Sequence, residues 1–181
     1  PCCFFMGGRV VKIHPESAKM FVVDEDVEKT KAAALRLLSR RAYTRKEIND
    51  KLTKREFKLA AIDTTLADLE RLELIDDRVF AKRFVDERLR LKPCGRILLA
   101  RDLKRRGVPV VVIDEIIEEA FDVVDTMAMA YEVLSARARR YERLEKSKAI
   151  NRMFGFLARR GFDGGTARDV AKRVWQEIED P

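Results

Sequence analysis

The hexapeptide LKRRGV at residues 103–108 marks the end of a helix and recurs twice along the chain. LTKREF at residues 52–57 and LARRGF at residues 157–162 share its pattern: a leucine, any residue, two cations, Gly or Glu, and an apolar residue. The three copies begin 51 and 54 residues apart. A period near 50 residues indicates a tandem array of structural units.

The pattern has a local physical cause at a helix C-terminus. Its leucine fits the buried face, its cations complement the negative end of the helix macrodipole, and its glycine fits the left-handed position after the last turn. The second and third copies follow this rule at Leu103, Gly107, Leu157, Gly161 and Phe162. Glu56 replaces the glycine in the first copy, so it either adopts a left-handed conformation or ends its helix differently.

Capping and periodicity predict three helices in each unit. Thr44 and Glu47 have the spacing of a capping box. Ile62, Leu66 and Leu69 recur at i, i+4 and i+7, as on one face of an amphipathic helix. The expected helices span residues 28–41, 44–55 and 59–73, then 77–91, 95–106 and 109–121, then 124–142, 146–160 and 164–179.

The sequence therefore predicts an all-α fold of three tandem three-helix repeats that form an elongated, curved body. Units of about 50 residues are marginal alone, so we expect adjacent repeats to stabilise one another. Two short apolar runs near the N-terminus indicate an extended arm or a small β-hairpin instead of helix, with strands at 10–13 and 20–23. The predicted segments are the arm at 1–27 and the repeats at 28–75, 76–123 and 124–181.

The composition limits the kinds of partner. The chain has 38 Lys and Arg against 31 Asp and Glu, which gives a net charge of +7. This excess suits a polyanionic partner, although it also serves solubility. Three cysteines without C-x-x-C spacing favour a reducing cytoplasm. No apolar run is long enough for a membrane span, and we expect a cytoplasmic monomer.

The sequence contains no arrangement typical of an enzyme. Its only histidine, His14, adjoins Pro15, and Cys94 stands at a predicted helix start without a neighbouring histidine. No glycine-rich phosphate loop occurs. A cluster of carboxylates lies along one predicted helix and is interpreted as a solvated face: Asp114, Glu115, Glu118, Glu119, Asp122 and Asp125. We therefore expect no catalytic residue, no metal and no cofactor.

Two basic regions are the candidate binding sites. Residues 88–106 contain eight cations and one acid, and residues 135–160 contain nine cations and two acids. Helical spacing places many of these cations on faces opposite apolar residues, where they could follow a phosphate backbone or an acidic protein groove. The candidates are Arg88, Arg90, Arg96, Arg101, Lys104, Arg105, Arg137, Arg139, Arg140, Arg143, Lys148, Arg152 and Arg159. Cation pairs at helix ends also have a simpler interpretation as capping residues.

The segment between the first two hexapeptides carries a further motif. Asp76 or Asp77 fits the cap of the fourth helix, and Phe80 and Phe84 lie one turn apart, directed into the core between repeats. The motif residues of this segment are Asp76, Asp77, Phe80, Ala81 and Phe84. Together with the Leu, Gly and Phe positions of the hexapeptides, this motif resembles the RecX family over about residues 30 to 178. We interpret these residues as architectural.

The resemblance implies a function that composition and spacing alone do not identify. RecX proteins modulate homologous recombination and the DNA damage response by binding along the groove of the RecA–DNA filament. Most depress its ATPase, strand-exchange and co-protease activities. The implied partners are thus RecA and single- or double-stranded DNA. The alternative is a helical DNA-binding protein that acts without RecA and reads a duplex through a helix-turn-helix pair.

Overall fold

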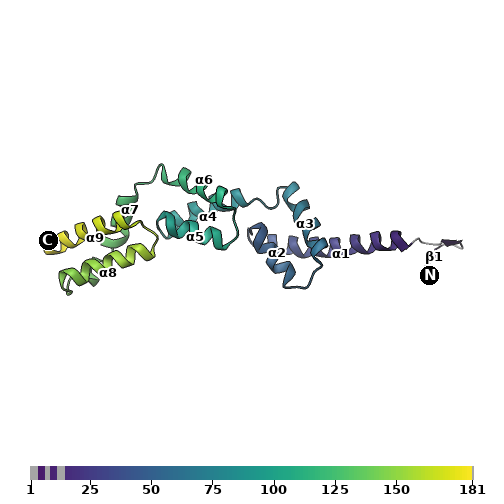
Figure 1. The fold of residues 1–181 in the computed structure, drawn as a ribbon, viewed down its shortest axis with the longest axis horizontal. Helices are drawn as coiled ribbons and strands as arrows, with labels where there is room; N and C mark the ends of the chain where they lie inside the picture. Colours follow the sequence, from purple (N-terminus) through teal and green to yellow (C-terminus); the bar gives the residue numbers. More distant parts are fainter. Residues whose placement is uncertain (1–3, 7–8, 12–14, 181) are drawn as a thin grey trace. The chain divides into compact units, whose positions relative to one another are not determined.

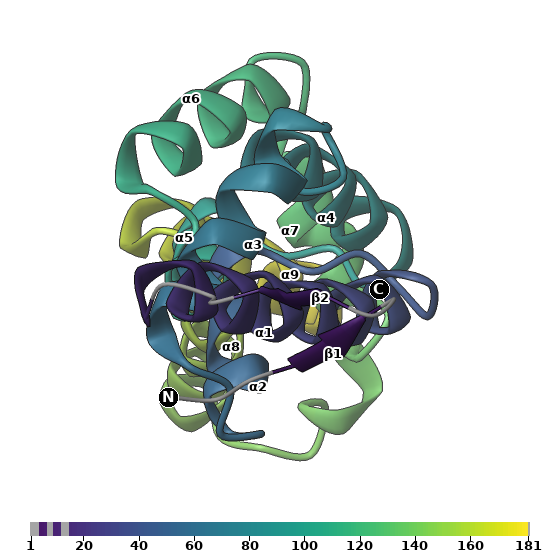
Figure 2. The ribbon, with the colours of Figure 1, turned by 90° about the vertical axis from the view of Figure 1, so that its right-hand side faces the viewer.

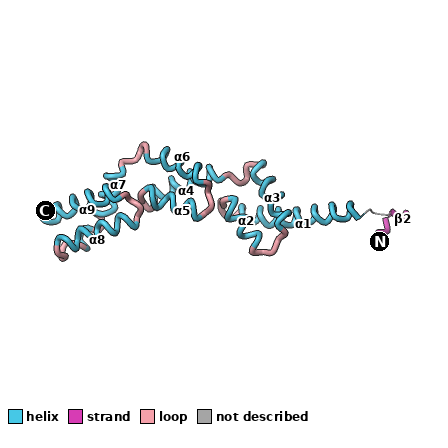
Figure 3. Tube along the Cα trace, in the orientation of Figure 1, coloured by secondary structure: helices cyan, strands magenta, loops and turns pink. Residues whose placement is uncertain are grey.

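The computed structural model describes residues 4–6, 9–11 and 15–180, with side chains from residue 25 onward. The chain divides into two compact units, Pro1–Asp76 and Asp77–Pro181, and each is described by itself. Within the described ranges there are nine α-helices, one 3-10 helix and two short strands (Figure 1). Loops between successive helices are short (Figure 3). The expected all-α fold of three-helix repeats is confirmed.

The first unit contains the hairpin and the first repeat. Strands β1 (Phe4–Met6) and β2 (Arg9–Val11) pair antiparallel, with Phe5 opposite Val10 (Figure 2). Helices α1 (Pro15–Leu38), α2 (Arg45–Thr53) and α3 (Leu59–Arg71) follow. They enclose a core whose largest fully buried side chains are Ile48, Leu52, Ile62, Leu66 and Leu69.

The second unit contains the other two repeats. The second repeat comprises α4 (Asp77–Leu91), α5 (Arg96–Arg105) and α6 (Val110–Phe121). The third comprises α7 (Thr126–Ser135), the 3-10 helix η1 (Ala138–Arg140), α8 (Lys146–Arg159) and α9 (Gly164–Glu179). Each repeat has its own buried cluster, and Met129 of α7 packs against both clusters. The two repeats therefore share apolar contact.

All three hexapeptides end their helices in the same way. The amide of the apolar residue donates to the carbonyl of the leucine five positions earlier, at 3.4 Å in the first copy and 3.2 Å in the other two. This bond defines the Schellman motif. Gly107 and Gly161 have φ 83°, and Glu56 has φ 62°. Of the two alternatives for Glu56, the left-handed conformation is therefore the one observed.

The N-terminal boundary differs from the prediction. The arm was expected to extend to residue 27, with a second strand at 20–23, but α1 begins at Pro15 and includes that segment. Proline is favoured at the first position of a helix because its missing N–H has no partner there in any case. Met20, Val23 and Val27 are also spaced by three and four residues, a helical period that the two-run interpretation overlooked. The two paired strands lie earlier in the chain, at residues 4–6 and 9–11.

The predicted helix 124–142 is also wrong, because α7 ends at Ser135. The chain then tightens through i to i+3 hydrogen bonds, from the Arg140 amide to the Arg137 carbonyl at 3.0 Å and from the Tyr141 amide to the Ala138 carbonyl at 2.8 Å. Tyr141 is buried in the core of the third repeat. The arginine run after residue 136 therefore lies on a 3-10 helix and its flanking turns instead of an α-helix.

Candidate binding groove

A groove of about 780 Å³ lies between η1 and α8 in the third repeat. It is referred to below as the third-repeat groove. Its lining includes five cationic side chains and no acidic one. The lining residues are Arg137, Arg140, Tyr141, Ser147, Lys148, Asn151, Arg152, Gly155, Phe156 and Arg159. Five of the predicted binding residues therefore converge on one concave surface.

Helix α8 holds three of these cations in a row. Lys148, Arg152 and Arg159 are exposed, whereas Met153 and Leu157 on the other face are fully buried. At about 100° per residue, positions 148, 152 and 159 fall within about 40° of one another around the helix axis. The row extends about 16 Å along α8 at about 1.5 Å per residue. The predicted division of this helix into cationic and apolar faces is confirmed.

Phe156 fixes the position of an arginine in the groove. The guanidinium of Arg137 lies over its ring at 4.9 Å, and that of Arg160 lies over it at 5.4 Å. Cation–π contacts of this kind restrict the rotamers of long side chains. Arg137 is half-buried for this reason, and its charge is held at the groove instead of moving freely in solvent.

The N-terminus of α8 is already occupied by a carboxylate. Glu145 accepts hydrogen bonds from the amides of Ser147 at 2.9 Å and Lys148 at 3.2 Å. The hydroxyl of Ser147 donates to the same carboxylate, and these hydrogen bonds lower the pKa of Glu145. An anion in the groove would therefore be bound by side chains and not by the free amides of the helix end.

Arg139 and Arg143 do not line the groove, although both are exposed. Of the four candidate arginines at residues 137–143, only Arg137 and Arg140 line the groove. Arg137 and Arg140 lie on the same side because residues three apart eclipse in a 3-10 helix. Partner contact by Arg139 and Arg143 stays a prediction.

The second repeat disperses its predicted cations. Arg88 and Arg105 both pair with the buried carboxylate of Asp102, at 3.1 Å and 3.3 Å. Arg88 also lies over the ring of Phe84 at 5.3 Å. Burial of Asp102 requires cationic partners, so Arg88 has a structural role in joining α4 to α5 and is a poor candidate for partner contact.

The remaining predicted cations of this repeat lie apart. Arg96 covers the ring of Phe121 at 5.0 Å. Arg90 lines a different, mostly apolar hollow between α4 and α6. Arg101 and Lys104 are exposed on α5, and among the described side chains no hydrogen bond or ion pair of theirs is found. These two cations are available to a partner.

The predicted architectural residues occupy structural positions. Phe80 and Phe84 stack with ring centroids 6.3 Å apart, and the guanidinium of Arg106 lies over both rings. Both rings pack against the core of the second repeat, and their predicted place between repeats stays a prediction. Asp77 is the first residue of α4 and directly follows Asp76. Fully or nearly fully buried are Ala81, Leu103, Leu157 and Phe162.

The acidic face of α6 has a role that the sequence analysis missed. Glu115 pairs with Arg78, and Glu119 pairs with Lys82 at 2.7 Å, so both join α6 to α4. The hydrogen bond from Lys82 lowers the pKa of Glu119. The interpretation of these two carboxylates as merely solvated is therefore incomplete. In both pairs the cation and the carboxylate are 37 residues apart. This repeated spacing of opposite charges could have indicated the pairing.

Among the described residues there is neither a candidate metal cluster nor a membrane-spanning helix. No group of three or more His, Cys, Asp or Glu side chains that could hold a metal ion is found among them. Cys94 is buried, and burial raises the pKa of its thiol, which disfavours the reactive thiolate. None of the described helices is both long and apolar enough to cross a bilayer. His14, Cys2 and Cys3 lie outside the described residues.

Tandem three-helix repeats, the third with a groove lined by five cations and no acid, define a helical-repeat protein with a cationic groove. Family models describe this architecture: the first three-helix domain of RecX matches residues 31–69, the second residues 76–120, and the third residues 124–175. The chain belongs to the RecX family.

Individual relatives agree with this assignment. The chain is 38% identical over 157 residues to the regulatory protein RecX of Chlorobium phaeobacteroides, covering 86% of this chain and 99% of that protein. It is 33% identical to the regulatory protein RecX of Corynebacterium efficiens, covering 91% and 83%. The crystal structure of RecX from Lactobacillus salivarius superposes with a TM-score of 0.69 at 25% identity, covering 87% and 99%. Another crystal structure of regulatory protein RecX gives 0.78 at 18% identity, covering 96% and 81%, and supports the fold alone.

Proposed function

We propose that this chain is a non-catalytic, cytoplasmic modulator of homologous recombination and the DNA damage response. In this proposal a monomer binds in the groove of the RecA–DNA filament and depresses its ATPase, strand-exchange and co-protease activities. The third-repeat groove is the observation that carries the proposal. Membership of the RecX family names the partner.

The charge of the groove supports binding to a polyanion. Five cations line it without an acid, so their potentials add within a concave surface. If all five neutralise phosphates, counterion release makes the logarithm of the association constant fall against log salt with a slope of about −4.5 for duplex DNA. An acidic face of RecA would gain affinity from the same cations, with a weaker dependence on salt.

A DNA-binding protein that acts without RecA is the second candidate. Reading a duplex sequence requires donors at the start of a recognition helix. Arg96 begins α5, but its guanidinium covers Phe121, which leaves Arg168 on α9 as the exposed candidate. Tight binding to one duplex sequence in the absence of RecA, with weak binding to unrelated duplexes, would favour this alternative.

A charge-reversal pair tests the proposal. The first double variant, Lys148→Glu with Arg152→Glu, reverses two charges in the groove. The second, Arg168→Glu with Lys172→Glu on α9, changes the net charge by the same amount outside the groove. All four side chains are exposed, so both variants should fold. We expect the groove variant to lose co-sedimentation with RecA filaments on single-stranded DNA and to lose inhibition of their ATPase, whereas the α9 variant retains both. Equal losses of binding and inhibition in the two variants would contradict the proposal, because net charge and not the groove would then determine binding.

A further inference from the structure

The second and third repeats meet end to end at two glycines. The amide of Gly95 donates to the Arg160 carbonyl at 3.0 Å, and the amide of Ile97 donates to the Gly161 carbonyl at 3.2 Å. The Arg160 side chain donates to the Pro93 carbonyl at 3.0 Å. Three hydrogen bonds therefore join the C-terminus of α8 to the N-terminus of α5. This contact is referred to below as the glycine junction.

The glycine junction replaces an ordinary helix cap. The first amides and last carbonyls of a helix lack partners within it. In the first and third repeats the second helix is capped by its own side chain, Thr44 for α2 and Glu145 for α8. Gly95 has the same place before α5 but no side chain to cap with. Carbonyls of the third repeat supply the acceptors instead, and the negative end of α8 faces the positive end of α5.

Close approach explains why glycine stands at both positions. A Cβ atom on Gly95 would lie 2.1 Å from the Gly161 carbonyl oxygen, and one on Gly161 would lie 2.3 Å from the Leu98 amide nitrogen. Backbone conformation alone is not the reason for Gly161, because Glu56 adopts a positive φ at the equivalent position of the first repeat. Both glycines are therefore required by the contact between repeats.

We propose that the glycine junction is a positioning device for partner binding. It holds the exposed α5 cations Arg101 and Lys104 in fixed register with the third-repeat groove, so both engage one filament as a single body. Met129, which packs against the cores of both repeats, adds a second point of attachment. A fixed register keeps the effective concentration of the second set of cations high once the first has bound. This inference rests on the proposed function.

Hydrogen exchange in the full chain tests the rigidity of the junction without reference to function. The amides of Gly95 and Ile97 should exchange at least about tenfold more slowly than that of Val111, which lies in the first turn of α6, a helix without a side-chain cap. Gly95→Ala should abolish this protection. Gly164→Ala is the matched control, because a Cβ there meets no atom within 4 Å. Unprotected amides at Gly95 and Ile97 in the parent chain would overturn the proposal.

Affinity for RecA filaments on single-stranded DNA tests the positioning role. Arg101→Gln with Lys104→Gln should weaken binding at least about fivefold in the parent chain, because two phosphate contacts are lost, and less than about twofold in the Gly95→Ala background. Equal effects in the two backgrounds would show that the junction is only structural. If the parent chain does not bind filaments at all, the proposed function fails instead.

Gly95→Ala could prevent folding of the second unit, so a milder variant is included. Arg160→Gln removes the bond to the Pro93 carbonyl and leaves both glycines in place. It should raise exchange at Gly95 and Ile97 and reduce the effect of the α5 substitutions in the same direction. Full protection together with an unchanged α5 effect would contradict the proposal.

Discussion

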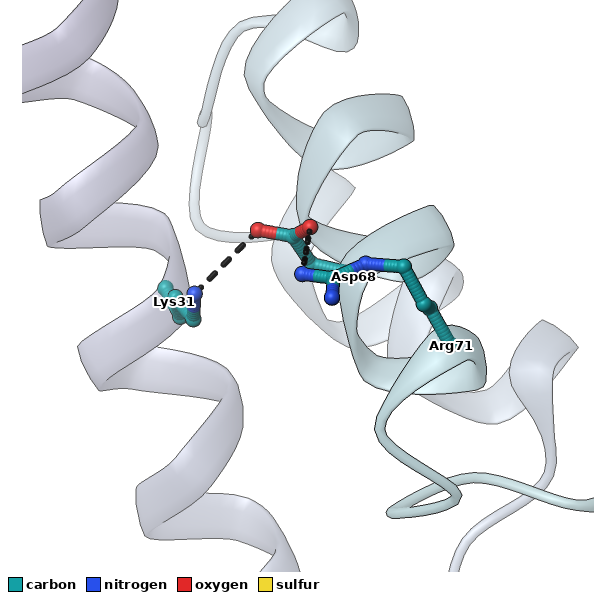
Figure 4. A network of polar contacts seen from close by, with 3 residues as sticks. All are labelled: Lys31, Asp68 and Arg71. Atoms are coloured by element: carbon teal, nitrogen blue, oxygen red, sulfur yellow. Dashed lines mark hydrogen bonds and ion pairs between the residues drawn. The ribbon is translucent and has the colours of Figure 1, made fainter.

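Lys82 and Glu119 form a 2.7 Å ion pair between α4 and α6 that repeats the pair formed by Lys31 and Asp68 between α1 and α3. The partners are 37 residues apart in both cases, and the two pairs are offset by 51 residues, the spacing of the first two hexapeptides. Figure 4 shows Asp68 between Lys31 and Arg71. The first and third helices of these repeats are thus joined at equivalent points.

The acid dependence of stability should reveal this pairing. The hydrogen bond from Lys82 lowers the pKa of Glu119 below its usual value of 4.5. A carboxyl whose pKa is lower in the folded state stabilises the fold above its unfolded pKa, and this contribution is lost as pH falls through the folded pKa. The parent chain should therefore lose its advantage over Glu119→Gln as pH falls from about 6 to about 3. Denaturant unfolding at each pH measures this difference, and a constant difference would contradict the account.

Asp102 should be a major determinant of stability in the second repeat. Its buried carboxylate accepts from Arg88 and Arg105, so Asp102→Asn weakens both ion pairs and leaves Arg88 poorly partnered. We expect the free energy of unfolding to fall by about 1–3 kcal/mol. Asp114→Asn, at an exposed position on α6, is the control and should change it by less than about 0.5 kcal/mol. Similar values for the two variants would show that the Asp102 network contributes little.

The cap of α2 gives a prediction for the first repeat. The hydroxyl of Thr44 accepts from the Glu47 amide at 3.1 Å in a buried position. Thr44→Ala should lower the free energy of unfolding by about 1 kcal/mol. Thr44→Ser should lower it much less, because serine also caps helices. Chemical denaturation followed by circular dichroism measures both. A Ser variant as unstable as the Ala variant would assign the effect to the lost methyl group instead.

A substitution at Gly155 should change stability and filament binding in opposite directions. Gly155 lies in the interior of α8, where alanine is favoured over glycine by about 1 kcal/mol. A Cβ there would lie 3.2 Å from Nη1 of Arg159, so that flexible side chain must shift. We expect Gly155→Ala to raise the free energy of unfolding and to weaken filament binding at the same time. Stronger binding would show that the observed placement of Arg159 is not the one a partner uses.

The sequence predicted the repeats because each hexapeptide satisfies its own helix end locally. Leu103, Gly107 and their equivalents need only nearby residues to form the Schellman motif. The row on α8 was predictable for the same reason, since helical period alone separates Lys148 and Arg152 from Met153. The helix ends and the α8 row, which depend on neighbours within a few residues, were thus correctly predicted.

Several features that the sequence analysis missed depend on distant contacts. The run after residue 136 was expected on an α-helix, but burial of Tyr141 in the third core is accompanied by a 3-10 turn that divides the arginines. Arg88 was assigned to partner contact. Its ion pair with Asp102 joins two different helices, so the sequence alone does not reveal it. The role of Gly95 had no local signal, since the Arg160 carbonyl that accepts from its amide lies 65 residues away. Tertiary packing decides each of these cases.

The salt dependence of binding tests the central claim most directly. Co-sedimentation with RecA filaments on single-stranded DNA is measured as salt is raised, for the parent chain and for Arg152→Gln with Arg159→Gln. If the groove contacts phosphates, the slope of log affinity against log salt should become shallower by about 1.4 to 1.8 for the two lost cations. An unchanged slope together with an unchanged affinity would contradict the account, because the groove would then take no part in filament binding.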